Sequence, residues 1–343
     1  MKHIGFIILL TLLVGCEGRT PSFSLLPTAN TFLQSGDDFN NKIDILWVID
    51  NSGSMHSSQV NVADNFNFFI QDFITKNYDY NIAVITSEAY LATIDDEPEM
   101  SKFRDGTDAT SHTGYFVIDN QTPEIENNFL INIMQGIAGD GDERAFSSFK
   151  DALNNSLNAG FLREDSFLAI INVSDEDDFS HDGSEFKGKQ YDYEGLHTIQ
   201  SYVDYLDELT ASSGATRRYS FNSIHVVTQE CDDELPFPYK GIRYSELVAA
   251  TGGVEGDICG NFATTLEDIS KNIIQLSTQF FLDREPILDT IVVLINGETV
   301  PQSELNGWSY NEAANSILFH GSYVPQQGAT ISINFDPATF NEG

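Results

Sequence analysis

The segment Asp50-Asn51-Ser52-Gly53-Ser54 concentrates side-chain oxygens of the kind that bind a hard divalent cation. The Asp50 carboxylate and the Ser52 and Ser54 hydroxyls offer three oxygens from one turn, and Mg²⁺ and Ca²⁺ prefer oxygen ligands. Because two of these ligands are neutral, a bound ion keeps positive charge. We therefore expect a carboxylate from a second molecule to complete the shell of the ion.

The flanking segments predict how this turn is held. Residues 43–49 form a nearly continuous apolar run, typical of a strand buried on both faces of a parallel sheet, and residues 60–74 have apolar side chains at helical spacing. Strands are also expected at 80–85, 115–118, 167–173 and 221–227, and helices at 125–137, 146–157, 196–209, 244–250 and 262–276. This alternation predicts an α/β fold with a doubly wound, mainly parallel sheet, whose ligands bind at the carboxyl ends of the strands.

An Asp-x-Ser-x-Ser turn between a buried strand and an amphipathic helix resembles the metal-ion-dependent adhesion site (MIDAS) of the von Willebrand factor A (vWA) family, over residues 41–279. The resemblance implies a vWA (Rossmann-like) fold, one divalent metal, and a protein ligand that presents a carboxylate. Mg²⁺ is the expected ion, with Ca²⁺ or Mn²⁺ as alternatives. The family also places an Asp after a later strand, which implies that Asp175 holds the metal through water.

The chain departs from the family pattern in one loop. The family contributes a Thr ahead of a helix, whereas residues 139–144 here read Gly-Asp-Gly-Asp-Glu-Arg. Glu143 or Asp142 would substitute as a ligand, which adds negative charge, weakens binding of an outside carboxylate and favours Ca²⁺. Thr86, Thr107 and Thr110 are the fallback candidates.

A second acidic segment, 176–178, follows Asp175. We expect it to be a solvated acidic loop, with an auxiliary cation site as the alternative. His181, close by in the sequence, is expected to be exposed rather than a metal ligand.

The charge balance excludes one class of function. The chain has 17 Lys and Arg against 52 Asp and Glu, a formal net charge of −35. Such a surface repels phosphate backbones and anionic headgroups within a Debye length. We therefore expect no nucleic-acid partner and interpret the acidity as a well-solvated surface.

The N-terminus indicates export. Lys2 precedes an apolar run over 4–14, about half the length of a membrane-spanning helix, which predicts a secretory signal. The run ends in Leu-Val-Gly-Cys16, which resembles a bacterial lipobox and implies lipidation (palmitate) of Cys16. Glu17 after it implies, by resemblance to sorting rules, the outer membrane, so that the only membrane contact is the lipid anchor.

The two remaining cysteines, Cys231 and Cys259, then lie in a compartment that permits disulfides. We expect a bridge between them, with two buried free thiols as the alternative. Neither residue has zinc-ligand spacing to a second Cys or a His.

The expected domains are a lipoprotein signal peptide (1–15), a tether (16–41), the vWA domain (42–282) and a small β-sandwich-like module (283–343). In the last, short alternating segments at 287–295, 309–310, 315–319 and 329–335 are separated by turns such as Asn296-Gly297. Trp308, Tyr310 and Phe319 are expected in its core.

The sequence is compatible with three functions. The favoured one is a surface lipoprotein, not an enzyme, that binds a partner through the metal in adhesion or envelope assembly. The alternatives are a structural envelope component with a vestigial metal site and a metal-dependent hydrolase. Haloacid-dehalogenase-like hydrolases also begin with an Asp after a first strand, but they need a second Asp where Ser52 stands. Other catalytic motifs of hydrolases are absent from the sequence.

Overall fold

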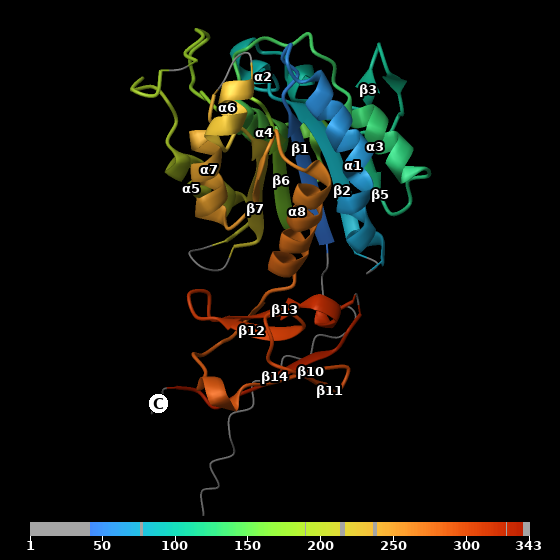
Figure 1. Ribbon diagram of the computed structural model, residues 1–343, viewed down its shortest axis with the longest axis vertical. Coiled ribbons are helices and arrows are strands. Elements are labelled where there is room, and N and C mark those ends of the chain that lie inside the picture. The colour runs from blue at the N-terminus through green and yellow to red at the C-terminus, as the bar shows by residue number, and fades with distance from the viewer. Residues whose placement is uncertain are drawn as a thin grey trace, which may run out of the picture.

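The computed structural model describes residues 42–75, 78–188, 190–212, 217–235, 239–326 and 328–338. Its main sheet has six strands, which are in spatial order β5 (Val117–Asp119), β2 (Asp79–Thr86), β1 (Lys42–Ile49), β6 (Phe167–Val173), β7 (Tyr219–His225) and β8 (Glu255–Asp257) (Figure 1). All pairs are parallel except β2 with β5. The α/β class and the mainly parallel sheet are thus confirmed.

Alternate side chains of β1 point to opposite faces of the sheet, as the pleat requires. Ile45 and Trp47 pack under α1 (His56–Thr75), α3 (Ile125–Ile133) and α8 (Phe262–Ser277). Leu46 and Val48 pack under α4 (Ala145–Asn154), α5 (Ile199–Leu209) and α7 (Ile242–Thr251). Burial on both faces explains why this strand is almost entirely apolar.

Several short elements were not predicted. They are α2 (Leu91–Ile94), α6 (Gln229–Glu234), the hairpin of β3 (Gly106–Thr107) and β4 (Ser111–His112), and single 3₁₀ turns at Pro98–Ser101 and Ser156–Asn158. Elements of two to six residues are too short to establish a hydrophobic period in the sequence.

The C-terminal part forms two three-stranded antiparallel sheets, and its strands are β9 (Phe280–Phe281), β10 (Val292–Ile295), β11 (Glu298–Val300), β12 (Gly307–Asn311), β13 (Ser316–His320) and β14 (Ile331–Asn334). Trp308 and Phe319 are buried in its core and Tyr310 packs against it, as predicted. The strand expected over 287–295 begins instead with a 3₁₀ turn, Leu288–Thr290. Because β9 pairs with β13, this part begins before residue 283.

The C-terminal sheets lie beyond the amino ends of the parallel strands (Figure 1). The Tyr78 hydroxyl, just ahead of β2, donates a hydrogen bond to the Pro325 carbonyl at 3.4 Å. The carboxyl ends of β1 and β6 therefore face away from this unit. Within the described ranges, no helix has the length and apolar character to cross a membrane.

Candidate functional site

Three adjacent strand ends bring the predicted residues to one edge of the sheet. Asp50 follows β1 and its amide donates to the Val173 carbonyl at the end of β6 (3.0 Å). Ser87 follows β2, and its amide donates to the Ile49 carbonyl (3.0 Å). The turns after β1, β2 and β6 are thus neighbours, because strands in parallel register end together.

The Asp50 carboxylate is fully buried and fixed by two donors. The Ser52 amide donates to Oδ1 and the Ser174 hydroxyl to Oδ2, both at 2.7 Å. Gln59, in the first turn of α1, donates to the Asp50 carbonyl at 3.0 Å and to the Gly136 carbonyl at 2.8 Å. Sequence reasoning missed Ser174 and Gln59, although Ser174 directly precedes the predicted Asp175.

The two serines of the motif are near each other and near Asp175. The Ser52 and Ser54 hydroxyl oxygens are 3.4 Å apart, and the Ser54 hydroxyl is also a hydrogen-bond neighbour of the Asp175 carboxyl. Ser52 is buried and Ser54 is half-buried. Four of the sequence-predicted ligands, Asp50, Ser52, Ser54 and Asp175, therefore share one location.

Glu143 joins this group. It is 1% exposed, and neither of its carboxylate oxygens has a well-aligned hydrogen-bond donor among the described residues, although Ser87 and Asp50 are neighbours. Oδ1 of Asp175 and the hydroxyl of Thr86 also lack partners in the described chain. Buried polar atoms are nearly always hydrogen-bonded in folded proteins, so this collection of unpaired oxygens fits a bound cation.

The electrostatics agree with this interpretation. Burial, followed by repulsion from Asp175, raises the pKa of Asp50 to about 6. Burial first and then the Asp50 charge raise the pKa of Glu143 well above its usual value, and burial raises the pKa of Asp175. No Arg or Lys is among the described groups that set these pKa values. Buried charges without a partner are costly, and a divalent ion would supply the missing positive charge.

The structure separates the two loop carboxylates that the sequence left as alternatives. Asp142 forms a buried two-point ion pair with Arg144, Nε to Oδ1 at 3.1 Å and Nη2 to Oδ2 at 2.6 Å. Arg144 therefore neutralises Asp142, and Glu143 is the carboxylate that faces Asp50. Of the fallback threonines, Thr86 ends β2 beside the site. Thr107 and Thr110 bond to each other at 3.1 Å at the turn of the β3–β4 hairpin.

The acidic segment after Asp175 is not the solvated loop that we expected. Asp177 and Asp178 are fully buried, and His181 is only 3% exposed. Asp178 accepts from the Phe146 amide at the start of α4 (2.9 Å) and pairs with Arg243 (3.3 Å). The expectation of a solvated loop was wrong because Arg243, 65 residues away, provides a counter-charge for the buried Asp178. The expectation of an exposed His181 was wrong because its two ring nitrogens lie 2.8 Å from the carbonyl oxygens of Phe179 and Glu185.

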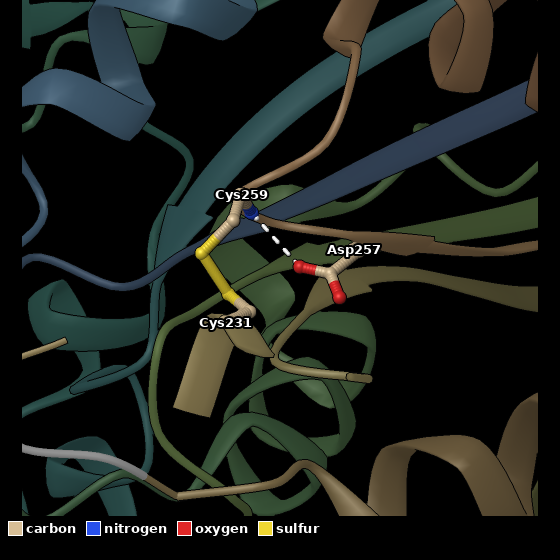
Figure 2. A group of neighbouring side chains, drawn as sticks. All are labelled: Cys231, Asp257 and Cys259. Carbon is tan, nitrogen blue, oxygen red and sulfur yellow. Dashed lines mark hydrogen bonds between the residues drawn. A yellow bond between two sulfur atoms is a disulfide. The ribbon is translucent and has the colours of Figure 1, made fainter. Parts of the chain in front are cut away.

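The predicted disulfide is present. Cys231 in α6 and Cys259 after β8 are bonded, and the Asp257 carboxylate accepts from the Cys259 amide at 2.9 Å (Figure 2). The candidate ligand atoms of Cys231, Asp257 and Cys259 all lie within 4.8 Å of one another, but both sulfur atoms already form the disulfide bond.

The carboxylates of Asp50, Glu143 and Asp175 are further apart than this, because within the described ranges they do not form a group whose ligand atoms all lie within 4.8 Å of one another. Their wider spacing fits a site in which water links one carboxylate to the ion.

Comparisons with known proteins leave the family open. No family model and no curated protein matches the chain. Proximal thread matrix protein 1 from the mussel byssus is similar in structure, with 12% identity, a TM-score of 0.39 and coverage of 71% of this chain and 50% of that one. The pilus adhesin SpaC from Lactobacillus rhamnosus GG has 14% identity, a TM-score of 0.37 and coverage of 86% and 39%. The chain thus spans half or less of either protein, and these scores support no assignment.

Proposed function

We propose that the α/β unit is a vWA domain whose MIDAS-type site, formed by Asp50, Ser52, Ser54, Asp175 and Glu143, binds one divalent metal and through it a protein partner. The observation that carries this proposal is the set of buried carboxylate oxygens without donors at the carboxyl edge of the sheet. A partner carboxylate is the expected group to complete the shell of the ion.

The chemistry of the ligands limits the choice of metal. Carboxylates and hydroxyls are hard oxygen donors that suit Mg²⁺, Ca²⁺ or Mn²⁺ rather than metals that prefer sulfur or imidazole. The carboxyl edge faces away from the C-terminal sheets, so a partner can approach it without meeting that unit (Figure 1). Binding, rather than catalysis, is the proposed role.

The proposed setting is the bacterial cell envelope, with Cys16 as a lipid anchor and the outer membrane as the location. Cys16, the signal peptide and the tether lie outside the described residues, so this part of the proposal rests on the sequence. The disulfide supports an exported chain, because such bonds persist in oxidising compartments.

Metal binding is tested first by calorimetry of the mature chain with Mg²⁺, Ca²⁺ and Mn²⁺. Asp50→Ala should lose the heat of binding, because Asp50 is the central carboxylate of the site. Absence of a signal from wild-type protein with all three ions would favour a vestigial, structural site.

Partner binding is then tested by capture from envelope or host-cell extracts with and without EDTA. Ser52→Ala should reduce metal-dependent capture, whereas Ser57→Ala, which removes an exposed hydroxyl in the first turn of α1, should not. Equal capture by wild type and Ser52→Ala, or capture that survives EDTA, would contradict a metal bridge.

A further inference from the structure

The loop that carries Glu143, residues 139–144, is held by hydrogen bonds to the turn at residues 50–54. The Gly139 amide donates to the Asn51 carbonyl at 2.9 Å. Glu88 joins the two segments, because its carboxylate accepts from the Asn51 side chain (2.8 Å) and from the Asp140 amide (2.9 Å). The loop is therefore held against Asp50 before any ligand arrives.

The other end of the loop is held by Arg144. Besides pairing with Asp142, its guanidinium donates to the carbonyls of His181 (3.0 Å), Gly183 (2.6 Å) and Glu185 (3.3 Å). The Glu143 carbonyl accepts from the Phe179 amide at 2.9 Å. The described hydrogen bonds of the guanidinium go to Asp142 and to these carbonyls, and none goes to the Glu143 carboxylate.

The resulting charge count changes what the site can accept. Asp50, Asp175 and Glu143 contribute three negative charges, and a divalent ion leaves the loaded site at a net charge of about −1. A site with only the two aspartates would be neutral when loaded. Glu143 therefore adds one negative charge to the repulsion that an approaching carboxylate meets.

We propose that Glu143 is an internal ligand that competes with a partner's carboxylate, so that it tightens metal binding and sets the affinity of the site for acidic ligands. This inference rests on the proposed metal site and specifies its selectivity. Glu143 is a fixed occupant of the coordination shell, held by the fastenings at Asn51 and Arg144. An acidic partner binds only by adding its carboxylate to the coordination shell of the metal or by displacing Glu143 from that shell.

The test uses Mn²⁺-loaded protein, with acetate as the carboxylate probe and water-proton relaxation to report the water that remains on the ion. Glu143→Gln preserves the shape of the side chain and removes its charge. We expect this variant to bind Mn²⁺ more weakly by about 10- to 100-fold and acetate more tightly by a similar factor, the size expected for one nearby charge in partly screened surroundings.

Two controls separate this inference from the proposal on which it rests. Asp140→Asn removes one exposed charge from the same loop and should change neither affinity. Asp50→Ala should abolish Mn²⁺ binding. If Asp50→Ala does so while Glu143→Gln matches wild type for both Mn²⁺ and acetate, the role of Glu143 is refuted and the metal site stands. If wild type and Glu143→Gln both fail to bind Mn²⁺, the metal site itself is wrong.

Discussion

Replacing Asp50 by Asn should stabilise the metal-free protein at neutral pH, although it removes a motif residue. Burial and the charge of Asp175 raise the pKa of Asp50 to about 6 from 3.8. A difference of roughly two pKa units corresponds to about 3 kcal/mol. Since Asp50 is 0% exposed, solvent screening does not reduce this figure.

The direction of this change in folding stability follows from proton binding. The folded, metal-free protein holds a proton on Asp50 more tightly than the unfolded chain does. The stabilising effect is therefore complete below pH 4 and is lost as the pH rises through about 6. Asn cannot ionise, so the variant escapes that loss above pH 6. The contact between residue 50 and Ser174 survives in the Asp50→Asn variant. The Ser174 hydroxyl can accept a hydrogen bond from the new side-chain amide and donate its own proton to the Glu176 carbonyl, 3.2 Å away.

Metal should remove most of this stability difference. An ion at a hundred times its dissociation constant stabilises the folded wild type by about 2.7 kcal/mol. In urea unfolding at pH 7.5, Asp50→Asn should be about 3 kcal/mol more stable than wild type in EDTA, and the difference should nearly vanish with saturating metal. The exposed replacement Asp140→Asn serves as the charge-matched control. A variant less stable than wild type in EDTA would refute the account of an uncompensated buried charge.

Two further predictions concern the framework of the site. Arg144→Met should destabilise the protein by about 3–5 kcal/mol in urea, with or without metal, because it leaves Asp142 buried without a counter-charge; a loss below 1 kcal/mol would show that the pair is dispensable. Replacing Cys231 and Cys259 together by Ser should cost roughly 3–4 kcal/mol through loss of a 28-residue loop closure, with no effect on metal affinity. Reduction of the wild type should have the same effect on its urea midpoint, and an unchanged midpoint would contradict this estimate.

The parts of the fold that follow from local pattern were predictable. The apolar run of β1 determines both a buried strand and the position of Asp50 at its end, and a similar run before Asp175 gives β6. The local patterns do not show that β1 and β6 are neighbours. This is seen only in the sheet itself, in which Ile49 of β1 lies beside Val173 of β6. The family resemblance supplied this proximity, since nothing in either segment alone indicates the pairing.

The choice between Asp142 and Glu143 could not be made from the sequence. Adjacent side chains leave the backbone in different directions, and which one faces Asp50 depends on where Arg144 finds its partners. Those partners include carbonyl oxygens of Gly183 and Glu185, about forty residues further along the chain. The local sequence pattern therefore identified the loop but could not decide which of its two carboxylates, Asp142 or Glu143, faces Asp50.

Two kinds of buried carboxylate among the described residues differ in what surrounds them. Asp178 has the Arg243 guanidinium beside it and the Phe146 amide at the start of a helix, so its charge is met by the protein. Asp50 and Glu143 are equally buried, yet their main neighbouring charges are negative. Burial alone therefore does not distinguish the two kinds of carboxylate, and the neighbouring charges do. No Arg or Lys is among the main described groups that shift the pKa values of Asp50 and Glu143, which supports the proposal that a metal ion binds to their hard oxygen atoms.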